Sequence, residues 1–251
     1  MGSTAWFKFA SPAAFYPLAG RLIPWFAWAA GLLTLIGLYL GFIVAPTDYQ
    51  QGESYRIIYI HVPAAWISMF AYLVMAAWCA ASLIWNTRMS AMMAQAIAPT
   101  GAMFALLALW TGAFWGRPTW GTYWVWDARL TSTLILFFLY LGFIALHSAI
   151  EDPRRADRAS ALLALVGAIN VPIIYFSVKW WNTLHQGASV SVNASPKMAQ
   201  TMLTGMLLMA LACWAYTIAV SLHRVRSLIL EREQHSGWVK DSVLPAGPKQ
   251  T

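Results

Sequence analysis

Two of the five histidines in this sequence lie where they could ligate a metal. His61 and His185 come from opposite halves of the chain; His61 lies at the start of one long apolar segment, and His185 follows another. Two neutral imidazoles that approach from opposite sides are a ligand set that a six-coordinate haem iron accepts. They suit zinc poorly, because no set of thiolates or carboxylates accompanies them. A hydrogen-bonded structural role for each histidine is the alternative that the residues leave open.

A tryptophan-rich stretch, Trp115 to Thr131, lies between these histidines in the sequence and reads WGRPTWGTYWVWDARLT. So many rings with so few aliphatic residues suit a surface that holds a flat, apolar ligand on its ring faces. An aromatic belt at a membrane interface is the alternative, although an anchor needs only one or two rings. We expect a loop here, because Gly116, Pro118 and Gly121 break regular structure. Its expected ligand-contacting residues are Trp115, Gly116, Trp120, Tyr123, Trp124 and Trp126.

Charged residues near the histidines and the aromatic stretch give candidate partners for acidic groups on a ligand. Arg56 lies five residues before His61, and Arg129 closes the aromatic stretch. We expect both guanidinium groups to meet ligand carboxylates. The only acid in the stretch, Asp127, is expected to fix the loop, either by pairing with Arg129 or by capping the next helix.

The elements that must position these residues are membrane spans. The chain has 251 residues, of which 60% are hydrophobic and only 10% charged, which excludes an ordinary soluble domain. Six apolar runs are long enough to cross a bilayer as helices, and none contains Asp, Glu, Lys or Arg. We expect an all-α polytopic protein with spans near Leu22–Ala45, Ile57–Leu83, Met92–Phe114, Leu130–Ile150, Ala159–Val178 and Thr201–Leu222.

The basic residues predict the orientation of these spans. Most of the 16 Lys and Arg residues fall in the N-terminus, two short turns and the C-terminal tail, so the positive-inside rule places both termini in the cytoplasm. The opposite face carries Arg56, Arg117, Arg129, Lys179 and Lys197 together with both candidate histidines. The net charge of +7 is therefore a topology signal. It predicts contact with membrane lipid and no nucleic acid.

Two further features of the sequence limit the function and divide the chain. No GxxxxGK motif occurs, so a nucleotide-driven step would belong to a partner. No carboxylate lies within an expected span, which argues against proton coupling. We expect residues 1–226 to form one six-helix membrane domain and residues 227–251 to form a cytoplasmic tail. The fifth span carries Asn170 and Pro172, which predict a kink and an interhelical hydrogen bond.

The run W-G-x-x-W-x-x-x-W-x-W-D-x-R-L-T, with a histidine on either side, resembles the tryptophan-rich WWD domain of haem-handling proteins. Together with the six spans and the segments DYQQGESYRIIYIHVPAAW and WWNTLHQG, it resembles the CcmC family, the haem exporter subunits of bacterial cytochrome c maturation system I. The resemblance covers nearly the whole chain. Tyr123 stands where some relatives have tryptophan, which keeps an aromatic ring.

The resemblance implies a haem transfer and export subunit of the bacterial inner membrane, not an enzyme. His61 and His185 would be the axial ligands of haem b, and the aromatic stretch with Asp127 would hold the haem at the periplasmic face. The implied acceptor is the periplasmic haem chaperone CcmE, which receives haem through a covalent bond between a haem vinyl group and a chaperone histidine. The other implied partners are the ATPase pair CcmA and CcmB and the small protein CcmD.

Two other classes of function stay open at this point. A cytochrome c haem ligase subunit shares the WWD domain, but ligases of this kind are longer. A membrane scaffold or secondary transporter would bind no haem, and the purified protein would then be colourless in a pyridine haemochrome assay.

Overall fold

The computed structural model describes residues 10–185 and 198–243, and in these ranges the chain is helical with no strand. The expected all-α fold is thus confirmed. The helices are α1 (Pro12–Tyr39) with a terminal π-helical turn η2 (Leu40–Val44), a 3-10 turn η3 (Glu53–Ile57), α2 (Ile58–Trp85), α3 (Arg88–Trp120), α4 (Ala128–Ala149), α5 (Pro153–Gly167), α6 (Asn170–Trp180), α7 (Gln200–Arg232) and α8 (Gly237–Val243).

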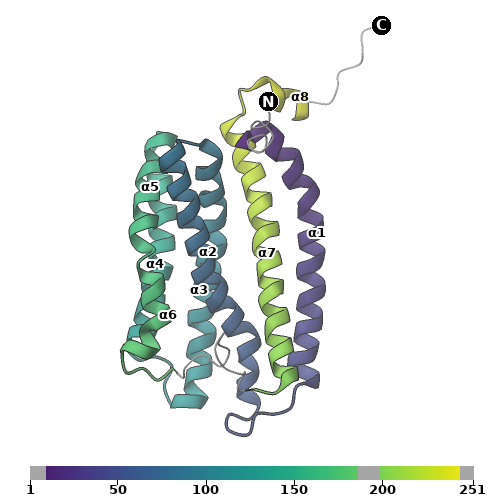
Figure 1. Cartoon of the computed structure of the whole chain (residues 1–251), viewed down its shortest axis with the longest axis vertical. Helices are drawn as coiled ribbons and strands as arrows, with labels where there is room; N and C mark the ends of the chain where they lie inside the picture. The colour runs from purple at the N-terminus through teal and green to yellow at the C-terminus, as the bar shows by residue number, and fades with distance from the viewer. Residues whose placement is uncertain (1–9, 186–197, 244–251) are drawn as a thin grey trace, which may run out of the picture.

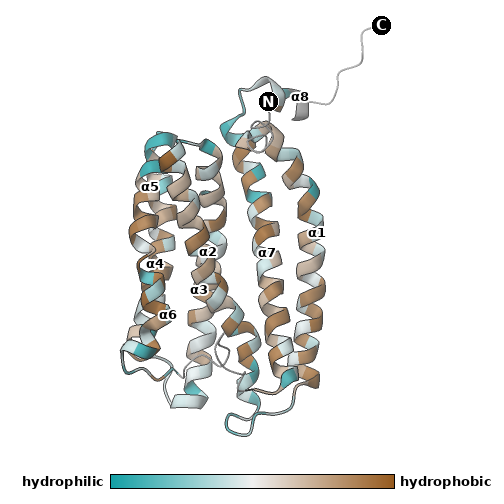
Figure 2. Cartoon of the chain, in the orientation of Figure 1, coloured by the Kyte–Doolittle hydropathy of each residue, from teal (hydrophilic) through white to brown (hydrophobic). Residues whose placement is uncertain are grey.

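Six of the helical segments in the described ranges are long and apolar enough to cross a membrane, as expected from the apolar runs. Hydrophobic residues predominate along the length of these helices, and hydrophilic residues gather toward their ends (Figure 2). The helices run past the apolar runs that predict them. The first span begins at Pro12 instead of near Leu22, because the Ser11 side chain caps the helix by accepting the Ala14 N–H.

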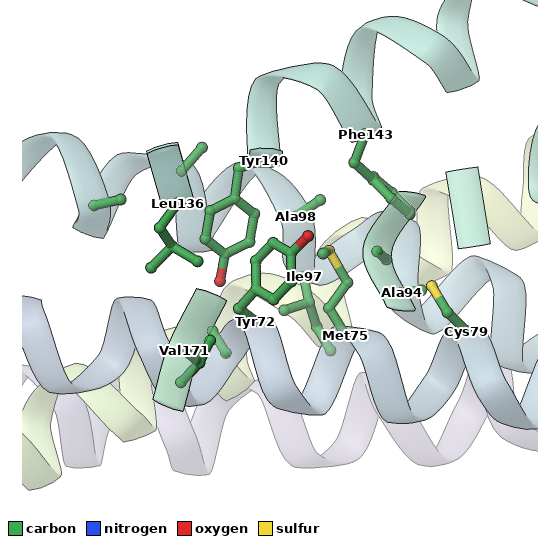
Figure 3. Packing of buried hydrophobic residues seen from close by; sticks show 14 of the residues in the cluster. Tyr72, Met75, Cys79, Ala94, Ile97, Ala98, Leu136, Tyr140, Phe143 and Val171 are labelled. Atoms are coloured by element: carbon green, nitrogen blue, oxygen red, sulfur yellow. The ribbon is translucent and has the colours of Figure 1, made fainter. Parts of the chain in front are cut away.

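The spans form two groups, which meet where α7 packs against α2 and α3. Helices α2 to α6 make one bundle, and α1 packs beside it against α7 (Figure 1). Glycine permits the close approach of α1 and α7, since a Cβ at Gly37 would lie 3.3 Å from the Met209 backbone nitrogen and 2.8 Å from Met209 Cγ. The core of the larger bundle contains Tyr72 and Tyr140, whose rings meet edge to face with centroids 4.9 Å apart (Figure 3).

The fifth span is broken between α5 and α6, at the place that the sequence predicts. The helix stops at Gly167 and resumes at Asn170. The Asn170 side-chain amide donates a 2.8 Å hydrogen bond to the Ser132 carbonyl oxygen on α4. The expected kink and interhelical hydrogen bond are therefore both confirmed.

The helix ends divide into two sets, on opposite sides of the bundle. We call one side the aromatic end, which comprises η3, the last turns of α3, the first turn of α4, residues 181–185 after α6 and the first turn of α7 (Figure 1). The opposite side, which we call the turn end, comprises the start of α1, the α2–α3 and α4–α5 turns and the end of α7. Because consecutive spans are antiparallel, the aromatic stretch and both candidate histidines lie at the aromatic end.

The structure corrects one expectation about the aromatic stretch. Gly116 and Pro118 do not interrupt the helix, and α3 continues to Trp120. The break comes at Gly121, which has φ of 80° and donates its N–H to the Arg117 carbonyl. Only residues 121–127 are non-helical, because α4 begins at Ala128. Proline has no N–H, so the carbonyl four residues before it loses its helical hydrogen bond. Close to a helix end, other groups can reach that carbonyl, and the helix therefore tolerates Pro118.

Candidate functional site

His61 and His185 line one cavity at the aromatic end. The cavity lies between α2, α3, α4 and α6, and Arg129 lines it as well. Its volume is about 30 Å³, which is room for about one or two water molecules. The remaining lining residues are Ala65, Ser68, Met69, Ala108, Leu109, Leu130, Thr133 and Ile174. The fold thus brings two imidazoles and one guanidinium, from three separate parts of the chain, to a single small space.

His61 is held by Thr111 on the neighbouring helix α3. The Thr111 hydroxyl donates its one proton to the Leu107 carbonyl at 2.6 Å. Its oxygen lies 3.1 Å from His61 Nδ1 and can only accept there, so Nδ1 must carry the imidazole proton. The lone pair of the neutral ring is then on Nε2. Thr111 therefore fixes both the direction of the ring and the tautomer that leaves Nε2 able to bind a metal.

Gly112 brings the His61 ring closer to α3 than any other residue would allow. A Cβ at this position would lie 2.9 Å from His61 Cε1. Trp115, one turn further along α3, meets the same ring edge to face, with centroids 5.5 Å apart. The imidazole is consequently fixed by the helix on which it lies and by the helix that it faces.

His185 is held more loosely, by residues that follow α6. Its backbone N–H donates to the Thr183 hydroxyl at 3.1 Å, and Thr183 in turn donates to Asp127. His185 Nδ1 lies 3.7 Å from Asp127 Oδ2 and has no hydrogen-bond partner among the described residues. The ring packs against Trp120 with centroids 5.0 Å apart. Burial, with the nearby Arg129 guanidinium as a second cause, lowers the pKa of His185 to about 4, and Asp127 opposes this shift.

Asp127 caps α4, as one of the two expected roles requires. Its Oδ1 accepts the Leu130 N–H at 2.7 Å, while Oδ2 faces Thr183 and His185. No ion pair between Asp127 and Arg129 occurs among the described residues. One carboxylate thus joins the start of α4 to the segment that carries the second histidine.

Arg129 and Arg56, both expected near the ligand, lie in different places. Arg129 lines the cavity with the histidines. Arg56 pairs with Glu53 and donates to the carbonyl oxygens of Gly41 and Ala45, which ties η3 to the end of the first span. Arg56 therefore does not line the cavity, and its hydrogen-bonding capacity is largely used within the fold.

Two of the expected aromatic residues form the inner wall of the aromatic end. The Trp115 indole donates a 2.7 Å hydrogen bond to the Gln51 side chain, and Trp120 packs on His185. Gly116 lets residues 121–127 fold back over α3, since a Cβ there would lie 3.0 Å from the Thr122 carbonyl oxygen. Each histidine is thus in contact with one tryptophan of the stretch, His61 with Trp115 and His185 with Trp120.

The other rings face outward. Trp126 is 77% exposed and meets Trp124 edge to face, with centroids 5.4 Å apart. Tyr123 is 56% exposed, with the Arg117 guanidinium over its ring. The Trp124 indole N–H is buried and has no hydrogen-bond partner among the described residues. An outer aromatic surface with one unpaired buried donor beneath it is suited to a flat ligand that bears acceptor groups.

The donor atoms of the site favour a metal that arrives already coordinated by a cofactor over a bare metal ion. No group of three or more His, Cys, Asp or Glu that could hold a bare metal ion occurs in residues 10–185 and 198–243. Two imidazoles alone leave a bare ion with too few ligands, whereas they complete the coordination of a porphyrin iron.

The sequence reasoning did not identify three residues of the site. Thr111 holds His61, Thr183 holds His185, and Gln51 holds Trp115. Thr111 could have been found, because it lies four residues before Trp115 and so on the same face of α3. Thr183 and Gln51 lie in non-helical segments whose approach to the aromatic end no periodicity predicts.

Comparison with known proteins gives a consistent match. A family model described as "Heme exporter protein C" matches residues 5–240. The heme exporter protein C of Bradyrhizobium diazoefficiens is 50% identical over 227 residues, which cover 90% of this chain and 86% of that protein. That of Escherichia coli K12 is 46% identical over 246 residues, with coverage of 96% and 98%. A putative cytochrome c biosynthesis ccmC-like mitochondrial protein of Marchantia polymorpha is 49% identical over 166 residues, with coverage of 66% and 69%.

Proposed function

The chain belongs to the heme exporter protein C family, and from that premise we propose that it binds haem b at the periplasmic surface of the bacterial inner membrane. We further propose that it delivers this haem to the periplasmic chaperone CcmE for cytochrome c maturation. His61 and His185 are the axial ligands of the iron in this proposal. Both termini are cytoplasmic, as the distribution of Lys and Arg favours.

One observation carries the proposal. Two imidazoles that are 124 positions apart in the sequence line the same cavity, and the hydrogen bond of one of them to Thr111 leaves its Nε2 free to coordinate. A structural histidine gains most when both ring nitrogens are paired within the protein. His61 has one nitrogen paired and the other directed by that pairing, which is the arrangement of a metal-binding histidine.

Haem binding requires this cavity to widen, because a volume of about 30 Å³ is far smaller than a porphyrin. His61 is fixed inside α2 and packs against Gly112 and Trp115. His185 lies beyond the end of α6, and the Thr183 hydroxyl holds its backbone. The segment carrying His185 is therefore the part that moves, while His61 stays in place.

The aromatic end supplies the other contacts in this proposal. Arg129 lies beside both histidines and suits a haem propionate, as does the unpaired Trp124 indole N–H. Trp126 and Tyr123 lie on the exposed side, where they would pack on the porphyrin and leave one edge accessible to the chaperone. Bound haem would supply the vinyl group that the chaperone takes, and the protein positions it without acting as an enzyme. ATP hydrolysis belongs to CcmA and CcmB, with CcmD as a further subunit.

The function is tested by purifying the protein with and without CcmE. We expect a pyridine haemochrome signal from the protein alone and transfer of haem to the chaperone when it is added. A colourless protein that binds no added haem contradicts the proposal and favours a scaffold or transporter. Attachment of haem to an apocytochrome without the chaperone favours a ligase instead.

Replacing Thr111 by valine is expected to weaken haem binding about tenfold, which is within the range for removing the partner of a ligating histidine. Valine keeps the shape of the side chain but cannot accept the His61 Nδ1 proton. Thr111→Ser keeps the hydroxyl and is the matched control. The dissociation constant is measured by spectral titration of the haem-free protein. Equal affinities for both variants would exclude a role of this hydroxyl.

The haem affinity is expected to stay constant between pH 7.5 and pH 5.5. Only neutral imidazole ligates iron, and an imidazole of ordinary pKa 6.5 would cost about tenfold in affinity per pH unit below that value. Because burial lowers the pKa of His185 to about 4, protonation competes only below about pH 5. Spectral titrations at half-unit intervals check this. A loss of binding centred near pH 6.5 would contradict it.

A further inference from the structure

A second and much larger cavity lies at the turn end, opposite the histidines. It is lined by the α2–α3 turn on one side and by the first two turns of α5 on the other. Its volume is about 450 Å³. The lining residues are Ser82, Leu83, Asn86, Thr87, Arg88, Arg154, Asp157 and Arg158. None of them belongs to the haem site, and the proposed function gives this cavity no role.

The cavity is strongly basic. Three of its lining residues are arginines, and its one acid, Asp157, is already engaged. Asp157 accepts hydrogen bonds from Arg232 at 2.7 and 2.8 Å, and His147 Nε2 lies 3.0 Å from its Oδ1. These contacts come from α7 and α4, outside the cavity lining. Asp157 is therefore neutralised from behind and contributes little negative charge to the space in front of it.

Two of the three arginines have no acidic partner. Arg88 lies 2.8 Å from Glu233 at the end of α7. Arg154 and Arg158 take part in no ion pair among the described residues. They are four residues apart on α5 and so lie on the same face of the helix, which places both guanidinium groups at the cavity. Two guanidinium groups without an acidic partner beside an open space suit an anion that accepts bidentate hydrogen bonds, such as a phosphate.

The surroundings of the cavity indicate which phosphate would occupy it. Ile84 and Trp85, the last residues of α2, are 71% and 68% exposed next to the cavity-lining Leu83 and Asn86. Their position at the end of a span places them where the hydrocarbon meets the headgroups. A molecule with a phosphate above apolar chains can fill the cavity and cover these side chains together. A free phosphate ion gains only the first of these contacts.

We propose that the arginine-lined cavity at the turn end binds the phosphate of an anionic phospholipid headgroup, with Arg154 and Arg158 as its principal ligands. Basic pockets between membrane helices on the cytoplasmic side are suited to such headgroups. The bound lipid joins the α2–α3 turn to the start of α5. Lipid therefore bridges two hairpins of the larger bundle, where the protein itself provides no ion pair between Arg154 or Arg158 and the opposite wall.

The test uses the full-length protein in detergent, with lipid binding followed by native mass spectrometry. Dioleoylphosphatidylglycerol is the anionic probe, and dioleoylphosphatidylcholine is the zwitterionic reference. We expect preferential binding of the anionic lipid by wild type. In the variant carrying Arg154→Gln and Arg158→Gln, the ratio of anionic to zwitterionic lipid bound should fall by about tenfold or more. Arg155→Gln is the matched control, because Arg155 is on the same helix but does not line the cavity; it should retain the preference.

Three outcomes would overturn the proposal. Wild type could bind both lipids equally. This outcome is measured without any variant, so it does not depend on whether the double variant folds. Arg155→Gln could weaken binding as much as the double variant does, which would indicate general surface charge. Inorganic phosphate at millimolar concentration could displace the lipid completely, which would indicate an ion site without the contribution of the apolar chains. Circular dichroism of each variant confirms that the helices are intact.

Discussion

Replacing either His61 or His185 by alanine is expected to abolish the absorbance of six-coordinate haem in the purified protein. Each substitution removes one of the two axial ligands that we propose, and among the described residues no other histidine lines the cavity. The remaining histidine can hold haem only in a five-coordinate form, with a weaker and shifted Soret band. The expected fall in affinity is larger than the tenfold loss for Thr111→Val, because a ligand is lost and not only its partner.

The histidine at the other end of the bundle is the matched control. His147 lies at the turn end, where it contacts Asp157 and Arg232. His147→Ala should therefore leave the haem spectrum unchanged. Glycine variants at 61 and 185 sharpen the test, since added imidazole can enter the space that the side chain leaves and restore the six-coordinate spectrum. Wild-type spectra in the alanine variants would contradict the axial assignment.

The two histidines should differ in what remains after substitution. His61 is fixed by Thr111, Gly112 and Trp115, whereas in our proposal the segment carrying His185 moves to admit the porphyrin. The variant that keeps His61 thus retains a preorganised ligand and should bind haem more tightly than the variant that keeps only His185. Spectral titration of the two variants side by side measures this difference.

The fold could be predicted from the sequence because each span is specified locally. Apolar runs of sufficient length predict the six helices, and Asn170 with Pro172 predicts the break in the fifth. The extent of α3 could not be predicted in this way. Gly116 and Pro118 have low helix propensity and so favour a break. The helix nevertheless continues through them, and in this conformation Trp115 packs on His61 and Trp120 on His185.

The site was predicted in part, for a similar reason. Antiparallel spans bring His61 and His185 to the same end of the bundle whatever their detailed contacts, and the structure places both at one cavity. Arg56 was expected there because it is near His61 in sequence. Arg56 lies in the 3-10 turn η3, before α2 begins, and its hydrogen bonds to the Gly41 and Ala45 carbonyls hold it against the end of the first span. Thr183 and Gln51 depend on how non-helical segments fold back, and the sequence carries no periodic signal for that.

Replacing Gly101 by alanine is expected to destabilise the protein by about 3 kcal/mol, through overpacking and the loss of a buried hydrogen bond. A Cβ at this position would lie 2.2 Å from the hydroxyl oxygen of Tyr140. Tyr140 is fully buried and donates a 2.8 Å hydrogen bond to the Ser68 carbonyl, so the ring cannot move aside without breaking this bond. Gly31→Ala is the control, because a Cβ there meets nothing within 4 Å.

Thermal unfolding followed with a thiol-reactive dye measures this effect, since Cys79 is 2% exposed in the same core and becomes reactive when the bundle opens. A double-mutant cycle with Tyr140→Leu separates the clash from the intrinsic preference of the helix interior for alanine over glycine, which acts in the opposite direction. If the clash is the cause, Gly101→Ala costs little once the tyrosine is absent, because the three atoms nearest to a Cβ at Gly101 belong to Tyr140. An undiminished cost in the Tyr140→Leu background would show that the Tyr140 ring is not the cause. The contact between α3 and α4 would then not be what requires glycine at position 101.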